Sequence, residues 1–466
     1  MLHLRFLRLS AVAGLALLTI LSLAASVRAA EVQKVLSPGG IEAWLIEDHS
    51  NPILAIEFAF SGGAALDPAG KEGLANMVSG LLDEGAGSYD STAFRTALEN
   101  NSISLSYSAS KDTFSGSLRT LTRNREKAVE LLRLSLTEPR FDAEPLERIK
   151  AQILTGIARR EKDPDALAGR TLWQLLYPDH AYGRETSGTV DSIAAIDSED
   201  LWAFVAERLN LKRLKIGVVG DITASELASL LDEAFGALPA AGDTTLVADV
   251  APANLGETVV IDAPIPQSIV AFAQPGLKRD DPDYYVAYVV NHILGGGGFT
   301  SRLFAEVREK RGLAYSVYSY LLPLDHTALV YGGVATAGER VGDSLNLIRA
   351  EWERLAEEGP TAEELEAAKT YLTGSFPLRF SNSGRIAGML LGMQIENLGI
   401  DYLERRNDYI DAVTLEDARR VARKLFDVKN LTVVVVGQPQ NVVPTRAAPE
   451  EPPAGQPADT EGKTQG

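Results

Sequence analysis

One short segment of this chain combines a guanidinium and a phenol, two side chains that can donate hydrogen bonds to a negatively charged oxygen. It reads REKRGLAY and runs from Arg308 to Tyr315. Arg308 falls in the last turn of a predicted helix, Gly312 ends that helix, and Tyr315 opens a predicted strand. Both side chains are donors that keep their protons near pH 7, as stabilisation of an oxyanion requires. They are candidate functional residues, although the helix dipole and strand propensity alone also explain these residue types here.

The glycine stretch just upstream has the composition of a phosphate-binding loop. No Lys-Ser or Lys-Thr pair follows Gly295–Gly298, and Arg302 does not replace that pair. The stretch therefore predicts a tight turn before a helix over Ser301–Lys310 rather than a nucleotide site.

Histidine is the commonest metal-ligating side chain, and here it occurs without a pair at ligand spacing. The chain has five His and no Cys. His3 lies near the N-terminus, and His49, His180, His292 and His326 are widely separated. His292 sits in an apolar helical pattern that is typical of a core histidine. The histidines alone therefore predict no metal site.

The N-terminal residues have the pattern of a secretory signal. Within residues 1–29, basic residues precede an apolar run over Ala11–Ala25, and small residues follow at Val27 and Ala29. The run is short for a membrane-spanning helix, which needs ~20 residues. Since the chain has no Cys, it has neither disulfides nor a lipid-attachment cysteine. We expect cleavage, export to a periplasm-like compartment and no integral membrane segment in the mature chain.

The overall charge and the C-terminal composition exclude some classes of partner and of structure. The formal net charge is −18, which disfavours nucleic acid and anionic membranes as partners. From Gln438 onward the chain is rich in Pro, Gly, Glu and Gln. Such a segment cannot bury enough apolar area to order itself, so we predict a disordered tail over residues 438–466.

The rest of the chain consists of two similar halves. The β-type run KRLKIGVVGD in the first half matches TVVVVGQP in the second, and these runs end at Gly220 and Gly437. A capped helix precedes each run, and each half begins with a β-type run, a polar turn and an amphipathic helix. The halves also share a Leu-Thr-Gly segment. Strands therefore alternate with helices in the same order twice.

This repeat predicts a protein in which one α+β domain is made twice. We place the domains at residues 30–238 and 255–437. The segment 239–254, small and polar with two prolines, is the predicted linker. Two such domains would face each other across a cleft, where binding sites usually form.

Three segments resemble the pitrilysin/insulinase family of zinc peptidases, the inverzincins, which includes the subunits of mitochondrial processing peptidase. They are GLANMVSGLLDEG from Gly73, LLYPDHAYGRETSGT from Leu175 and LGGGGFTSRLFAEVREKRGLAYSVYS from Leu294. The resemblance covers nearly all of the chain after the signal. It implies the architecture of processing peptidase subunits, an α+β fold of two homologous α/β-sandwich domains, each a mixed sheet with helices packed on it. It also implies a structural turn at His180.

The family's zinc motif is H-x-x-E-H on the helix after GLA, where two His one turn apart bind the ion and Glu activates water. The same five positions of this chain read NMVSG. Asn76 and Gly80 replace the two His, and Ser79 replaces the Glu. The apolar stripe over Leu74–Leu82 predicts that the helix itself is kept, with Asn76 and Ser79 on its polar face.

The family's third ligand, a Glu on a later helix, falls at or beside Gly156, which has no carboxylate. Glu161 lies in the charge run ARREKDPD, whose usual meaning is a solvated helix end. The resemblance therefore implies that this chain binds no zinc and has no cofactor of its own, and that a partner subunit carries the metal.

The resemblance also implies that Arg308 and Tyr315 hydrogen-bond substrate backbone and oxyanion in trans. The predicted function is an exported, non-catalytic subunit that pairs with a zinc-bearing homologue to cleave unstructured peptides. A non-proteolytic scaffold or peptide-binding protein is the alternative. A third possibility, an active peptidase with an unrecognised site, is disfavoured by the missing ligands.

Overall fold

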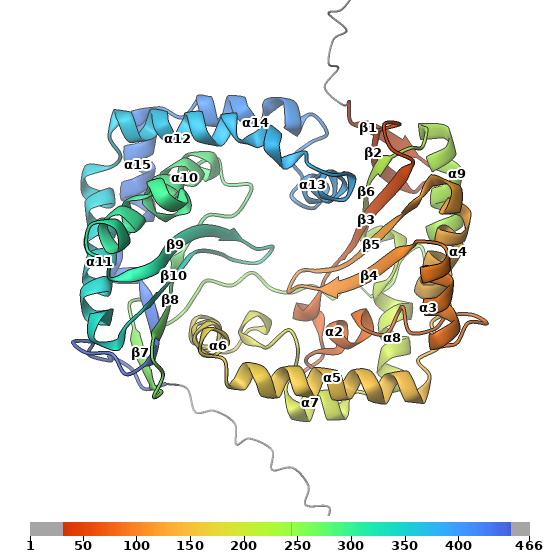
Figure 1. The fold of residues 1–466 in the computed structure, drawn as a ribbon, viewed down its shortest axis with the longest axis horizontal. Helices are drawn as coiled ribbons and strands as arrows, with labels where there is room; N and C mark the ends of the chain where they lie inside the picture. The colour runs from red at the N-terminus through yellow and green to blue at the C-terminus, as the bar shows by residue number, and fades with distance from the viewer. Residues whose placement is uncertain (1–30, 244, 449–466) are drawn as a thin grey trace, which may run out of the picture.

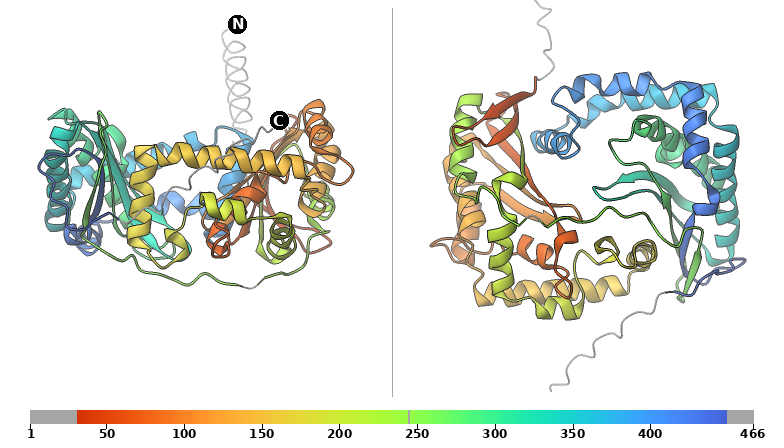
Figure 2. Two further views of the ribbon diagram at one scale, coloured as in Figure 1. Left: turned by 90° about the horizontal axis from the view of Figure 1, so that it is seen from below. Right: turned by 180° about the vertical axis from the view of Figure 1, so that it is seen from behind.

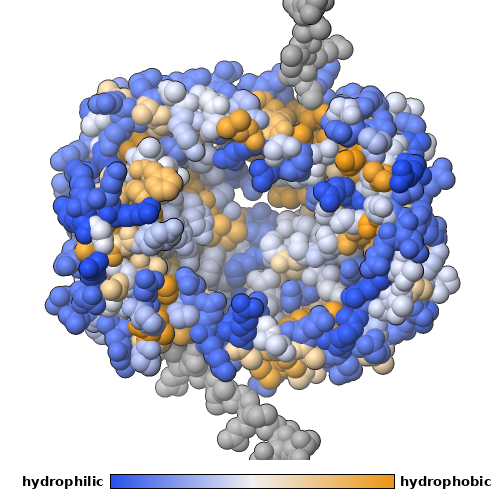
Figure 3. Space-filling view, viewed as in Figure 1, coloured by the Kyte–Doolittle hydropathy of each residue, from blue (hydrophilic) through white to orange (hydrophobic). Residues whose placement is uncertain are grey.

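The computed structural model describes residues 31–243 and 245–448, and it shows two mixed β-sheets that face each other (Figure 1). The predicted signal at residues 1–29 and the last part of the predicted tail, 449–466, lie outside the described residues. In the space-filling view a hollow separates the two halves (Figure 3).

The first half is built on a six-stranded sheet in the order β1-β2-β6-β3-β5-β4. Its strands are β1 Gln33–Leu36, β2 Glu42–Glu47, β3 Ile53–Ser61, β4 Ser104–Ala109, β5 Thr113–Leu121 and β6 Leu214–Gly220. Helices pack against one face and form a single large apolar core with it. They are α2 Leu74–Ser79, α3 Ser91–Asn100, α4 Arg125–Thr137, α5 Ala143–Glu161, α7 Val190–Ala195, α8 Ser198–Arg208 and α9 Ala224–Phe235.

The second half has a five-stranded sheet in the order β7-β11-β8-β10-β9. Its strands are β7 Thr258–Asp262, β8 Ser268–Pro275, β9 Ala314–Pro323, β10 Ala328–Thr336 and β11 Thr432–Gly437. A second apolar core joins one face of this sheet to its helices. They are α10 Tyr284–Asn291, α11 Val341–Glu358, α12 Ala362–Gly374, α14 Tyr402–Asp411 and α15 Leu415–Leu425.

The two sheets have the same topology, which confirms the repeat. In the first, β2 pairs with β6 in parallel and the order continues antiparallel through β3, β5 and β4. In the second, β7 pairs with β11 in parallel and β8, β10 and β9 follow in the same sense. The matching runs end at glycines in similar conformations, Gly220 with φ 149° and Gly437 with φ 141°. Among the described residues, strand β1 has no counterpart in the second sheet.

The halves exchange one helix each, which the sequence did not predict. Helix α6 (Pro164–Leu176) follows α5 in the first half, yet its buried side chains pack on the second sheet. Helix α13 (Ser383–Ile395) follows α12 in the second half, yet it packs on the first sheet. Gln394 fixes α13 there, because its side-chain amide donates to the carbonyl of Ile216 on β6 over 2.7 Å. Both crossings are visible in Figures 1 and 2.

A single glycine allows α13 to approach the first sheet closely. A Cβ on Gly217 would lie 2.3 Å from the carbonyl oxygen of Ala387, a backbone atom of α13. We predict that Gly217→Ala lowers the free energy of unfolding by about 1–3 kcal/mol, as overpacking does. Gly388→Ala on the same helix is the control, because its Cβ meets open space and should gain up to about 1 kcal/mol. Urea denaturation of both variants measures this, and equal stabilities would contradict it.

The segment between the halves crosses one face of the molecule (Figure 2) and is held to the second sheet. Ala253 donates to the carbonyl of Leu176, and Asn254 donates to the carbonyl of Leu175, both on α6.

The predicted disordered tail needs a correction, because residues 438–448 contact the fold. Thr445 donates through its backbone to Thr258, and Arg446 forms a bridge beside β7. No helix in the described part of the chain is long and apolar enough to cross a membrane.

Candidate functional site

The four positions that correspond to zinc ligands and base lie on α2 and α5, which pack together. Helix α2 is shorter than the apolar stripe predicted, because it ends at Ser79 and Gly80 caps it by donating to the carbonyls of Asn76 and Met77. Ser79 is buried rather than on an exposed polar face, and its hydroxyl donates to the carbonyl of Asn76 over 2.8 Å. Its hydroxyl is therefore already used by the helix backbone.

The facing side of α5 offers no ligand either. A Cβ on Gly80 would lie 3.3 Å from the Cγ2 of Ile149, whereas a Cβ on Gly156 would meet nothing within 4 Å. Glu161 is exposed at the C-terminal end of α5, as its charge run predicted. Within the described residues no group of three or more His, Cys, Asp or Glu side chains could hold a metal ion. The residues at these four positions do not fit zinc.

Two histidines have the structural roles that the sequence predicted. His180 caps a turn, since its Nδ1 accepts from the backbone of Tyr182 over 3.1 Å and its Nε2 donates to the carbonyl of Ala248 over 3.0 Å. His292 is buried, and its ring stacks on that of Tyr371 with centroids 5.2 Å apart. Burial lowers the pKa of both histidines, so both rings favour the neutral form.

The segment that carries Arg308 and Tyr315 departs from regular geometry at both residues. The helix predicted over Ser301–Lys310 contains a π-helical stretch, Phe304–Glu309, in which Lys310 donates to the carbonyl of Ala305. The register between β9 and β10 then shifts so that Tyr315 is the extra residue of a β-bulge. Bulges and π-helical turns recur at functional sites because they re-aim side chains. Tyr315 is 79% exposed as a result.

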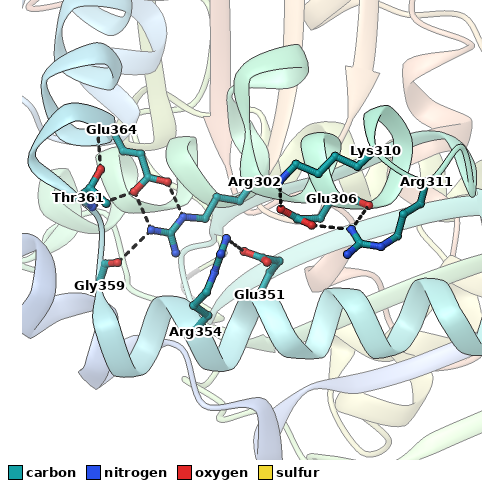
Figure 4. A network of polar contacts seen from close by, with 9 residues as sticks. All are labelled: Arg302, Glu306, Lys310, Arg311, Glu351, Arg354, Gly359, Thr361 and Glu364. Carbon is teal, nitrogen blue, oxygen red and sulfur yellow. Dashed lines mark hydrogen bonds and ion pairs between the residues drawn. The ribbon is translucent and has the colours of Figure 1, made fainter.

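The other cations near Arg308 form ion pairs with carboxylates, and Arg308 differs from them in this respect. Glu306 accepts from Lys310 and from Arg311, each over 2.5 Å (Figure 4). At the start of the segment Arg302 forms a bidentate pair with Glu364, with both contacts at 2.7 Å. These ion pairs lie on either side of Arg308, whose own guanidinium forms no ion pair with a carboxylate of the described residues.

Arg308 is surrounded by aromatic rings instead. Its Cζ lies 4.7 Å from the ring centroid of Phe304, 4.9 Å from that of Tyr315 and 5.6 Å from that of Phe299. We call these four residues the Arg308 cluster. Phe299 is 75% exposed, and among the described residues neither the Arg308 guanidinium nor the Tyr315 hydroxyl has a hydrogen-bond partner. The cluster thus presents a charged donor and a neutral donor to solvent.

Two family profiles match successive parts of the chain. Insulinase (Peptidase family M16) matches residues 43–190, and the peptidase M16 inactive domain matches residues 195–372. The chain belongs to the M16 insulinase/pitrilysin family. The M16 matches cover α2, α5 and the Arg308 cluster.

M16 relatives of this chain have been named in different ways. A non-peptidase homolog, YmxG, of Helicobacter pylori is 28% identical over 84% of this chain and 90% of that protein. An uncharacterized zinc protease of Streptomyces coelicolor is 31% identical over 66% of this chain and 68% of that protein. The β subunit of mitochondrial processing peptidase from Blastocladiella emersonii is 24% identical over 84% and 86%, respectively.

A solved structure supports the architecture. The peptidase M16 inactive domain from Pseudomonas fluorescens has a TM-score of 0.82 and 30% identity to this chain, of which it covers 90%, while 100% of that structure is matched. The two-domain M16 fold predicted from the sequence is therefore confirmed.

Sequence reasoning missed the two phenylalanines of the Arg308 cluster. Phe304 precedes Arg308 by four positions, which places the two side chains on one face of a helix, and this spacing could have identified it. Phe299 gave no such signal, because the turn after the glycine stretch brings it back over Arg308. In this M16 chain the α2 positions belong to the first half and the cluster to the second. No hydrogen bond, ion pair or ring contact between described residues joins the two sets.

Proposed function

We propose that this M16 chain is an exported, non-catalytic subunit that pairs with a zinc-bearing homologue and supplies Arg308 and Tyr315 to peptide cleavage. The observation that carries the proposal is the contrast between the four zinc-site positions and the Arg308 cluster. Asn76, Ser79, Gly80 and Gly156 fit no metal, whereas Arg308 and Tyr315 present donors that have no hydrogen-bond partner among the described residues.

The ion pairs around the cluster support a role in binding a carbonyl oxygen. Donors stabilise developing negative charge best when they are already oriented, because no reorganisation is then needed at the moment of reaction. Glu306 and Glu364 fix the segment, and the aromatic rings hold the guanidinium by cation–π contacts. Donors that are oriented and open to solvent favour a binding role for this cluster over that of a scaffold alone.

The partner subunit is the second part of the proposal. Similarity to a processing peptidase subunit supports pairing with a homologue, and the N-terminal signal pattern supports export. The acidic charge supports neither nucleic acid nor anionic membrane as a partner. Unstructured peptides are the proposed substrates of the pair.

We predict that the isolated mature chain contains no stoichiometric zinc and does not cleave unstructured peptides, because its α2 and α5 positions supply no ligands. Mass-spectrometric metal analysis and a fluorogenic peptide assay in zinc-replete buffer measure both. Cleavage should appear when the chain is co-expressed with a homologue that carries H-x-x-E-H. About one zinc per chain with chelator-sensitive cleavage by the chain alone would refute the proposal, and a stable pair without cleavage would favour the scaffold.

A further inference from the structure

A pocket of about 300 Å³ lies in the second half and shares no residue with either candidate set. Its walls come from the loop between β8 and α10, from α10 itself, from the short helix Phe376–Arg379, and from α13 and α14. These helices lie together at the top of Figure 1, where α13 leaves the second half to reach the first sheet.

The charges that line this pocket do not balance. It contains three guanidinium groups, those of Arg279, Arg379 and Arg406, and one carboxylate, that of Glu396. Among the described residues Glu396 forms no ion pair with any of them. This excess of two positive charges lies in a chain whose formal net charge is −18. Local concentration of one sign of charge in a concave site attracts ions of the opposite sign.

The most buried of these cations, Arg406, has no carboxylate partner in the described part of the chain. It is only 5% exposed, and its Nη1 donates to the carbonyl of Leu372 over 3.2 Å and to the Oδ1 of Asn407 over 2.9 Å. Its Cζ also lies 4.1 Å from the ring centroid of Phe376. These neutral contacts orient the guanidinium, but they do not neutralise it. A buried charge without a counter-ion is costly, so an anion would be strongly favoured beside it.

Among the described residues, Arg279 and Arg379 likewise form no ion pair. Arg279 lies 4.2 Å from the ring centroid of Tyr284, and its Nη2 donates to the hydroxyl of Tyr285 over 2.7 Å. Arg379 is exposed and has no ion-pair or hydrogen-bond partner among the described residues. The three cations therefore lie at different depths of one pocket. Arg406 and Arg279 contact aromatic rings, and Arg379 is exposed at the surface.

We propose that this pocket binds an organic carboxylate that carries an apolar or aromatic group. The guanidinium groups supply the planar, two-pronged donors that a carboxylate accepts. Met389 and Met393 from α13 and the ring of Phe376 supply an adaptable apolar wall beside them. The volume lies at the lower end of the ~300–1,000 Å³ that small-ligand pockets occupy. A free organic acid and the C-terminal residue of a peptide share this chemistry.

Isothermal titration calorimetry of the mature chain alone tests whether the pocket binds a carboxylate. The probes are N-acetyl-phenylalanine and its amide. We expect the acid to bind at least about tenfold more tightly than the amide, which corresponds to 1.4 kcal/mol. Equal affinities, or no heat from the acid, would overturn the proposal. A tetrapeptide ending in Phe, as acid and as amide, distinguishes the sources. If its acid form binds as the small acid does, the ligand is a peptide end, and if only the small acid binds, it is a free acid.

Three variants locate the site. Arg379→Gln should weaken binding of the acid several-fold without affecting the fold, because this side chain is exposed and unpaired. Glu396→Gln should tighten binding of the acid several-fold, because it removes a negative charge that repels the ligand's carboxylate. A variant that merely destabilised the fold could not bind the acid more tightly. Arg385→Gln on the exposed face of α13 is the matched control and should change nothing. Unchanged affinity in both pocket variants would place the acid elsewhere and overturn the proposal.

Discussion

Replacing Tyr315 with Phe is expected to slow peptide cleavage by the reconstituted complex roughly 100- to 1000-fold, with a smaller effect on KM. This is the loss that follows removal of one donor to an oxyanion, about 2.7–4 kcal/mol. The change deletes only a hydroxyl that has no partner among the described residues, so the ring can keep its place beside Arg308. Turnover falls more than affinity because the hydrogen bond strengthens in the transition state.

Steady-state cleavage of a fluorogenic peptide measures the effect, after co-purification has shown that the variant still binds its partner. Tyr320→Phe is the matched control, because Tyr320 is also an exposed tyrosine of β9 but stacks on Tyr318 outside the Arg308 cluster. Arg308→Lys keeps the charge and loses the planar fork, so it should retain part of the activity that Arg308→Ala loses. Unchanged turnover in both Tyr315→Phe and Arg308→Ala would mean that the cluster is structural.

The repeat made much of the fold predictable, because each half of the sequence tests the interpretation of the other. The runs that end at Gly220 and Gly437 became the equivalent strands β6 and β11, and both glycines adopt backbone conformations with positive φ. The exchange of α6 and α13 was beyond prediction. Periodicity shows that one face of a helix is buried, but it does not tell which sheet buries it. The close approach at Gly217 depends on that choice.

The candidate site, like the fold, was only partly predictable from the sequence. The replaced ligand positions could be read from residue types alone, because Gly80 and Gly156 lack any side chain. The exposure of Tyr315 could not, since it depends on a one-residue shift between β9 and β10. Whether Arg308 forms an ion pair depends on which cations bind Glu306. The segment REKR contains three cations, and Glu306 accepts from the other two. Likewise, composition placed residues 438–448 in the tail, whereas the backbone N–H groups of Thr445 and Arg446 donate to the carbonyl of Thr258 on β7.

Three substitutions are expected to give this chain a zinc site: Asn76→His, Gly80→His and Gly156→Glu. Positions 76 and 80 lie one turn apart, so two imidazoles there can reach one ion. Gly80 has an ordinary right-handed helical conformation, and its new Cβ requires Ile149 to move by a few tenths of an ångström. A side chain at position 156 enters open space. Two His and one Glu with an open fourth position match the ligand set of catalytic zinc sites.

The triple variant should contain about one zinc per chain, and zinc at 100 times its Kd should raise the free energy of unfolding by about 2.7 kcal/mol. Metal analysis and urea denaturation with and without chelator measure both. Ser79 stays unchanged in this design, because a Glu there would bury a carboxylate. Adding Glu161→Gln is the control and should leave the zinc in place, since Glu161 is exposed at the end of α5. A folded triple variant without zinc would show that α2 and α5 no longer direct these positions to a common point, and that this half has lost the site's geometry as well as its ligands.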